Sequence, residues 1–264
     1  MTRQQLITLL TDFGSRDSYV GAMKGVIAAR APEARVLDIC HEVPPQDVQR
    51  AGIIWSEALP FFPPGAVHVA VVDPGVGGRR RILAAEARGS YFLAPDNGLL
   101  GYVLRAGKAR RVVEVRNRKC FLPDVSSTFH GRDIFAPVAA GLCQGLELES
   151  LGPPARSYLR RSLPREQRRR RRGVTEARGV VLYVDGFGNA VTNLAPAAGV
   201  RLVRLEAGSI VFPRLARSYD EVGPGEALVL VGSSGRIEVA VNLGSAAALL
   251  GLRQGDPVRA VWRS

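Results

Sequence analysis

The chain has 264 residues, 46% of them hydrophobic and 23% charged, a balance that excludes a protein disordered over most of its length. This length suits one large domain or two modest ones. Apolar runs such as VHVAVV and ALVLVG are far shorter than the roughly 20 residues of a membrane span, and no signal-peptide pattern precedes the TDFG segment. We therefore expect a cytoplasmic protein without a membrane partner.

Positive charge is concentrated in one segment. The formal net charge is +12, and the stretch RRSLPREQRRRRR at 160–172 holds eight arginines against one glutamate. Such a run is typical of a solvated connector whose like charges repel, with contact to RNA or another acidic surface as the alternative. We expect an arginine-rich linker at 161–173, which includes Arg168 to Arg172, between domains at 1–160 and 174–264. We do not expect a nucleic-acid partner.

Strand-like and helical segments alternate before this linker. The first helix is expected to begin near Asp17 or Ser18 and to end at Ala31, because a proline follows. The alternation predicts βαβ units and an α/β domain with a mostly parallel sheet. Strands are predicted at 6–13, 36–40, 67–73, 82–87 and 91–96, and helices at 17–32, 47–62 and 133–145.

The pattern changes after the linker, where short apolar runs are separated by Gly, Pro, Asp and Ser with scarcely any helical periodicity. This spacing predicts a small all-β domain, a barrel or a sandwich. Its strands are expected at 179–185, 201–207, 209–212, 227–232, 236–242 and 257–262.

Residues that commonly bind metals are sparse. The three cysteines are widely separated and form no CxxC pair, so neither a disulfide framework nor a zinc site is predicted. Only His130 lies in a polar, glycine-flanked turn, whereas His68 alternates within a strand as a buried or edge residue and His41 is expected to cap a strand end. No HExxH motif or two-histidine-one-carboxylate cluster is visible, so no metal is expected.

Polar residues follow several of the apolar runs, at the strand ends where α/β sheets bind ligands. Asp12 follows LITLLT, Asp73 opens DPGVGG after VHVAVV, a DNG turn lies at 96–98, TFHGRD lies at 128–133 and DGFGN at 185–189. Each alone is explained as a turn or a helix cap, but their number together indicates a site. The glycine loop lacks the P-loop lysine and the GxGxxG spacing, and no GxSxG elbow is present, which disfavours nucleotide binding of those types and acyl-enzyme chemistry.

In their order, the motifs TDFG, VVDPGVGGRRR, APDNGLL, STFHGRDIFAP, VDGFGN and GSSGRIEVAVNLGSAA resemble the S-adenosyl-L-methionine (SAM) hydroxide adenosyltransferases. These adenosine-forming SAM hydrolases are related to the SAM-dependent fluorinase and chlorinase. The resemblance implies an α/β domain with a central sheet between helices, followed by a C-terminal β-barrel. It also implies SAM as the substrate, no cofactor, and a homotrimer whose active sites lie between one subunit's N-terminal domain and its neighbour's C-terminal domain.

The resemblance implies a catalytic set of Asp73, Arg80 and His130, which positions and polarises the attacking water. Three consecutive arginines, 79–81, leave open which one points inward. An arginine would keep the aspartate ionised, and the histidine could orient the water or accept its proton. In the halogenases a hydroxyl residue shortly after the aromatic of the TF segment helps to form the halide pocket. Gly131 stands there in this chain, which favours hydrolysis.

Substrate contacts carry over by the same resemblance. Asp12 matches the residue that receives both ribose hydroxyls, and Asp17 is a weaker candidate in the following turn. Ser233 matches a serine that meets the methionine carboxylate, although Ser234 stands where relatives have arginine. Asp185 and Asn189 match the pair that holds the methionine amino end and the adenine side of the substrate, and Phe187 is expected to pack against it. Glu238, Asn242 and the backbone of Val241 are the candidates for contacts to the adenine edge.

Three hypotheses remain open at this point. The chain hydrolyses SAM to adenosine and L-methionine, or it transfers a halide to SAM in the manner of the chlorinase. The third is a non-catalytic module that binds SAM or adenosine and uses the arginine run to touch nucleic acid.

Overall fold

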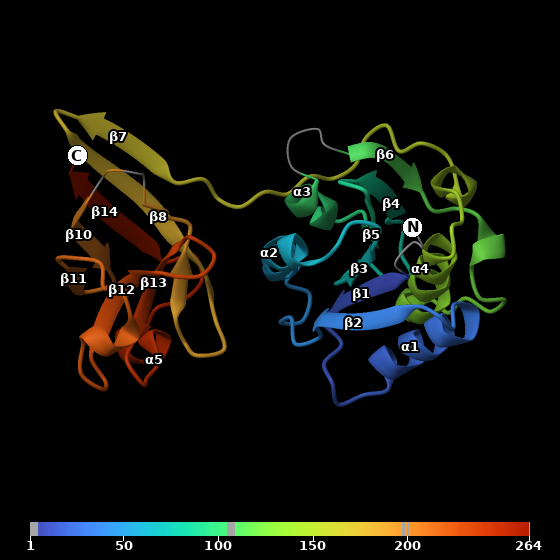
Figure 1. Ribbon diagram of the computed structural model, residues 1–264, viewed down its shortest axis with the longest axis horizontal. Helices are drawn as coiled ribbons and strands as arrows, with labels where there is room; N and C mark the ends of the chain where they lie inside the picture. Colours follow the sequence, from blue (N-terminus) through green and yellow to red (C-terminus); the bar gives the residue numbers. More distant parts are fainter. Residues whose placement is uncertain (1–4, 105–108, 197–198, 200, 264) are drawn as a thin grey trace. The chain divides into compact units, whose positions relative to one another are not determined.

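The computed structural model describes residues 5–104, 109–196, 199 and 201–263, and its contacts divide into two compact units, Met1–Ser162 and Leu163–Ser264. Each unit has its own sheet and its own buried core (Figure 1). Within the described ranges, no helix is both long enough and apolar enough to cross a membrane.

Unit 1 is built on a six-stranded sheet with the order β2-β1-β3-β5-β4-β6. The four strands β2, β1, β3 and β5 are parallel to their neighbours, and β4 and β6 are added antiparallel. Parallel strands covered on both faces read as continuous apolar runs, and β1 is accordingly buried along its whole length. The strands are β1 Leu6–Thr11, β2 Arg35–Cys40, β3 Val67–Val71, β4 Ile82–Ala87, β5 Ser90–Pro95 and β6 Ala109–Glu114.

Helices cover both faces of this sheet. On one face Met23 and Ile27 of α1 (Tyr19–Arg30) pack with α4 (Ala136–Cys143) over the β1 and β3 side chains. On the other face Trp55 of α2 (Val48–Ala58) packs with α3 (Leu99–Val103). Figure 1 shows α1 and α4 side by side. The shorter helical turns are η1 Leu59–Phe61, η3 Arg118–Cys120, η4 Gly131–Phe135 and η5 Leu148–Leu151.

Unit 2 is an antiparallel, barrel-like sheet. Its order is β11-β10-β14-β8-β9-β13-β12, and β7 pairs with β8 outside this order. The long strand β8 pairs with β7 and β14 through its first part and with β9 through its last part, which curls the sheet around a core that includes Trp262. The elements are β7 Gln167–Arg171, β8 Val174–Val184, β9 Ala190–Thr192, β10 Arg201–Ala207, β11 Ile210–Phe212, η6 Tyr219–Glu221, β12 Ala227–Val231, β13 Ile237–Val241, α5 Ala246–Leu250 and β14 Pro257–Arg263.

The expected fold class is confirmed, namely an α/β part with a mostly parallel sheet between helices followed by a small β-barrel. One expectation needs correction. Part of the arginine-rich segment is not a linker, because Gln167–Arg171 is strand β7 and pairs in register with Val174–Arg178. The arginines of β7 are exposed to solvent, which screens their repulsion. On the partner strand β8, Glu176 lies opposite Arg169 and Thr175 opposite Arg170, so no like charge faces either arginine.

Candidate functional site

Two carboxylates lie at the carboxyl ends of neighbouring parallel strands. β1 and β3 pair from Ile7↔Val67 to Thr11↔Val71, so the segments that begin with Asp12 and Asp73 leave the sheet at the same edge. Burial raises the pKa of Asp12. The Gln46 N–H, which donates to Asp12 Oδ2 over 2.8 Å, opposes that rise, and the charge of Asp73 adds to it. The two acids are therefore electrostatically coupled.

Asp73, Arg80 and His130 converge. Arg80 Nε lies 3.0 and 2.9 Å from the two carboxylate oxygens of Asp73, and Arg80 Nη2 lies 2.5 Å from Oδ2. The same Nη2 lies 2.7 Å from His130 Nδ1. The side chains of Asp73 and Arg80 are only 5% and 12% exposed, so water screens this ion pair weakly.

The Arg80 contact determines the form of the His130 ring. A guanidinium has donors but no acceptor, so His130 Nδ1 must accept, and in the neutral ring Nε2 then carries the hydrogen. Burial lowers the pKa of His130 and the Arg80 cation lowers it further, against the opposing charges of Asp73 and Asp133 and a hydrogen bond to the Ser126 backbone. His130 is thus a neutral imidazole with an N–H donor opposite Arg80.

A close backbone contact holds the DPGVGG loop against the His130 turn. Gly77 has φ +73°, and a Cβ built there would lie 2.1 Å from the Ser127 carbonyl oxygen. Only glycine fits both the left-handed backbone and this approach. The loop is closed internally by bonds from the Val76 N–H to the Asp73 carbonyl and from the Gly78 N–H to the Gly75 carbonyl.

Asp133 organises the turn that presents His130, and it was not among the predicted site residues. Its carboxylate is fully buried, accepts from the Ser126 N–H (2.8 Å) and pairs with Arg132 Nε (2.6 Å). Ser126 Oγ in turn accepts from the Phe129 N–H (3.0 Å). A buried acid at the start of an apolar helix, in GRDIFAP, is the sequence feature that could have identified it.

The three consecutive arginines have separate partners. Arg81 bonds Asp96 through Nε (2.9 Å) and Nη2 (2.5 Å), and Arg79 is exposed. Asn97 donates to the Val72 carbonyl (2.7 Å) next to Asp73. The DNG turn therefore supports the strand ends, and Arg80 is the arginine that reaches Asp73.

A polar chain supports the TDFG turn from behind. Lys24 Nζ donates to Asp38 (2.6 Å), whose other oxygen lies 3.0 Å from His41 Nε2. His41 Nδ1 lies 2.8 Å from Thr11 Oγ1, which accepts from the Phe13 N–H (3.2 Å). The expected position of His41 at the end of a strand is confirmed, because it follows β2 and bonds across to β1.

In unit 2, four of the predicted residues line one cavity of about 540 Å³. They are joined by Tyr219, Leu243 and Gly244, which sequence reasoning missed. Phe187 is 82% and Leu243 88% exposed, so apolar surface is presented at this cavity. The four predicted residues are Phe187, Asn189, Val241 and Asn242.

Asp185 shapes the DGFGN turn at this cavity. Its Oδ1 accepts from the Phe187 and Asn189 N–H groups (2.9 Å each), and its Oδ2 accepts from Asn189 Nδ2 (3.0 Å). Burial raises the pKa of Tyr219, and the charges of Glu238 and Asp185 raise it further. Asp185 therefore lies close enough to Tyr219 to act on its hydroxyl group electrostatically.

Three further predicted residues lie, like Asp185, outside the lining of that cavity. Glu238 is 9% exposed and lies against Gly232, where a Cβ would meet its carboxylate. Ser233 is exposed in the following turn, and Asp17 is exposed in the bend before α1.

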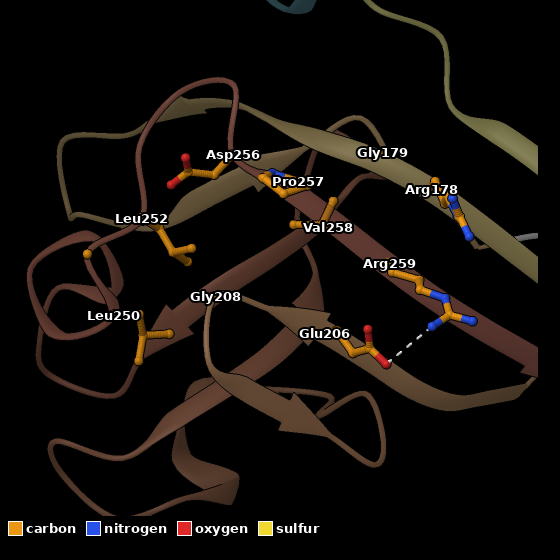
Figure 2. Close-up of a pocket in the computed structure, with 11 residues that line it drawn as sticks. Arg178, Gly179, Glu206, Gly208, Leu250, Leu252, Asp256, Pro257, Val258 and Arg259 are labelled. Atoms are coloured by element: carbon orange, nitrogen blue, oxygen red, sulfur yellow. Dashed lines mark ion pairs between the residues drawn. The ribbon is translucent and has the colours of Figure 1, made fainter.

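Two other cavities lie near polar side chains. One of about 420 Å³ in unit 1 is lined by His130, Gly77, Arg118 and Ser127. The other, of about 540 Å³, lies on the outside of the unit 2 sheet and is lined by Arg178, Glu206 and Arg259 among others (Figure 2). None of the predicted site residues lines the latter.

Comparison with known proteins matches both units. The family model described as "SAM hydroxide adenosyltransferase N-terminal domain" matches residues 7–152, and the model of the corresponding C-terminal domain matches residues 179–259. The chain is 44% identical to an (R)-S-adenosyl-L-methionine hydrolase of Thermus thermophilus, over 96% of this chain and 98% of the relative.

A crystal structure of an uncharacterized conserved protein from Thermotoga maritima has a TM-score of 0.84 at 38% identity and covers 96% of this chain and 99% of that one. A fluorinase of Actinopolyspora mzabensis is 27% identical over 96% of each chain.

Proposed function

Since the chain belongs to the SAM hydroxide adenosyltransferase family, we propose that it hydrolyses SAM to adenosine and L-methionine. Water attacks C5′ in line with the C5′–S bond, the bonding pair leaves with sulfur, and the water's surplus proton passes to Asp73 and from there to solvent. No cofactor takes part. The observation that carries the proposal is the contact of Arg80 with both Asp73 and His130 at the carboxyl end of the sheet.

A sulfonium leaves as a neutral thioether, so the leaving group needs no acid. The enzyme's task is to hold a water molecule and C5′ in near-attack geometry, which can supply several kcal/mol of the barrier reduction. A carboxylate close to the sulfonium stabilises the ground state as well, so charge alone does not accelerate the step.

The three side chains divide this task. His130 donates from Nε2 to the water oxygen, because its Nδ1 is occupied by Arg80. Asp73, held in place by its ion pair with Arg80, accepts a water hydrogen and takes the proton as the C5′–O bond forms. His130 is then a positioning donor for the water, not its base.

Substrate recognition is shared between the units. Asp12 receives the ribose hydroxyls, with Asp17 as a further candidate. The unit 2 cavity formed by Phe187, Asn189, Val241 and Asn242 receives the adenine, with Tyr219 as a wall. Asp185 and Ser233 serve the methionine end, and Glu238 acts from behind the cavity. We propose a cytoplasmic homotrimer in which unit 2 of a neighbouring copy completes each site.

The halide-transfer alternative is favoured by the similarity to a fluorinase, but Gly131 opposes it. A Cβ at Gly131 would lie 3.2 Å from Met23 Sδ and from the Phe13 ring, so a hydroxyl-bearing residue would crowd this turn. Sequence and packing thus agree on a glycine at this position.

Turnover in heavy-oxygen water tests the proposal. Purified protein is incubated with SAM, and adenosine is followed by chromatography and mass spectrometry, with fluoride, chloride or bromide added in parallel. We expect adenosine that carries one solvent oxygen, at a rate independent of halide. Halogenated nucleoside would select the transferase, and SAM binding without adenosine release would select the non-catalytic module.

A further inference from the structure

The outer face of the strands β7, β8, β14 and β10 carries most of the excess charge of unit 2. Residues directly opposite one another in an antiparallel sheet share a face. Arg171 lies opposite Val174, Val174 opposite Arg263, and Arg263 opposite Arg201, so this row crosses all four strands. Adjacent strands are about 4.8 Å apart, so the row spans about 14 Å.

The neighbouring row on the same face repeats the pattern. Arg169 lies opposite Glu176, Glu176 opposite Val261, and Val261 opposite Arg204. Successive residues on one face of a strand are about 6.7 Å apart, so the two rows lie side by side on the outer face.

The third row holds Arg178, Arg259 and Glu206, which border the cavity in Figure 2. Arg178 and Arg259 both pair with Glu176 at 3.0 Å, and Arg259 also lies 3.7 Å from Glu206. These pairs are surface-exposed and weak.

Cations exceed anions on this face. Together the rows present seven arginines and two glutamates, a net charge of +5. Arg169, Arg171, Arg201 and Arg263 are exposed and make no ion pair with another described residue. The alternate positions Ala177, Leu205, Ala260 and Trp262 are buried, so the arginine side chains are fixed to the outside. We call these three rows the arginine face.

The chemistry of this face fits one class of partner. Unit 1 and unit 2 each carry a formal charge of +6, so a second copy of the chain offers no complementary charge. The apolar residues on the face are Val174 and Val261, both half-buried, and Val203, exposed at the β10 bulge, which is little apolar surface for a lipid to receive. It presents no aromatic ring on which unpaired bases could stack.

We propose that the arginine face binds the phosphate backbone of a nucleic-acid duplex without sequence preference. Arginine matches phosphate geometry through paired N–H donors. Rows of arginines with no element that reads base edges contact backbone phosphates and carry no sequence readout. This binding goes beyond the hydrolysis reaction and uses none of the residues assigned to it.

Fluorescence anisotropy of the full-length protein with a labelled DNA duplex of about 20 base pairs tests the proposal. Four unpaired arginines that each displace a counterion give a slope of log K against log salt of about −3.6, or about a 150-fold loss of affinity between about 50 and 200 mM NaCl. The triple variant Arg169→Gln, Arg171→Gln, Arg263→Gln should reduce the slope to about −1 and weaken binding at least about tenfold at intermediate salt.

A charge-matched control separates the face from net charge. The variant Arg35→Gln, Arg110→Gln, Arg156→Gln removes three exposed arginines of unit 1 and should retain the wild-type slope. Thermal melts and SAM hydrolysis of the face variant should match the wild type. Equal losses in the two variants, a wild-type slope near zero, or tighter binding to vesicles rich in phosphatidylserine than to the duplex would each overturn the proposal.

Discussion

Arg80 determines what its two partners can do. It pairs with the Asp73 carboxylate and occupies Nδ1 of His130. The two neighbours thereby become an acceptor and a donor, which are the two functions needed to orient one water molecule. Arg79 and Arg81 cannot substitute, since one is exposed and the other is bound to Asp96.

Replacing Asp73 by Asn tests this division. Asn keeps the shape but loses the charge that pairs with Arg80 and accepts the proton. We expect kcat for adenosine release to fall at least about 100-fold, the lower range for loss of a general base, while KM for SAM changes little. Asp124→Asn, an exposed acid of the same unit, is the control and should leave kcat unchanged. An unaltered kcat in Asp73→Asn would contradict the assignment.

The pH profile tests His130. Its pKa lies below the usual 6.5 because of burial and Arg80. Protonation at Nδ1 removes the acceptor for Arg80, so kcat should fall as the pH drops through a midpoint below about 6.5 and be constant above it. His130→Asn, which retains a side-chain N–H donor, should keep more activity than His130→Ala. Equal losses of activity in both variants would indicate that His130 acts as the base and not as a hydrogen-bond donor.

His68 is expected to make the stability of the protein depend on pH. It is 2% exposed, its Nδ1 lies 2.9 Å from Thr8 Oγ1, and burial lowers its pKa to about 4. Between about pH 6.5 and 4 the unfolded chain binds a proton that the folded chain does not, so stability falls as the pH falls across this window. The expected contribution is on the order of 3 kcal/mol.

Urea unfolding at several pH values measures this contribution. The pH-dependent part of the unfolding free energy should shrink in His68→Gln relative to the wild type. The same slope in both proteins would show that another group is responsible.

At the scale of elements, the DPGVGG loop depends on its backbone more than on its side chains. Gly77 allows the loop to touch Ser127 and so brings Asp73 and Arg80 to the His130 turn. The buried Asp133 fixes the other partner of this contact. In the proposed mechanism, the alignment of Asp73, Arg80 and His130 thus depends on two loops that meet backbone to backbone.

Gly77→Ala should separate these loops. We expect kcat to fall at least about tenfold and stability to fall by about 2 kcal/mol, from left-handed strain of about 1 kcal/mol plus the clash with Ser127. Gly65→Ala is the matched control, because Gly65 also has positive φ but nothing lies within 4 Å of its Cβ position. It should show the strain alone, with kcat unchanged. Similar kcat losses in both variants would contradict the role of the contact.

Element prediction succeeded where apolar periodicity was strong. The runs LITLLT and VHVAVV are buried parallel strands, and Asp47 caps α2 by accepting from the Arg50 N–H. The five-residue helices α3 and α5 are too short to show a period. β7 was missed because its charge pattern resembles a connector, and only pairing with β8 makes it a strand.

At the scale of the whole molecule, the order of the motifs along both units predicted the family, and the family models match both units. The sequence alone was less informative about which side chains come into contact. The convergence of Asp73, Arg80 and His130 followed from resemblance, whereas Asp133 and Tyr219 have no motif of their own and are brought into place only by folding.

Assembly is the prediction at this scale. A homotrimer with sites completed by a neighbouring copy should elute at three times the chain mass in size-exclusion chromatography with light scattering. Because such a site is incomplete in a monomer, activity per chain should fall on dilution into the range where the trimer dissociates. Constant specific activity in a demonstrated monomer would contradict shared sites.

The most direct measurement is a crystal structure with an unreactive SAM analogue in which nitrogen replaces the sulfonium sulfur. The account predicts an ordered water within hydrogen-bond distance of Asp73 and of His130 Nε2, opposite the bond from C5′ to the nitrogen. A ligand whose C5′ lies away from these two side chains, or a nucleophile position bordered by neither, would contradict it.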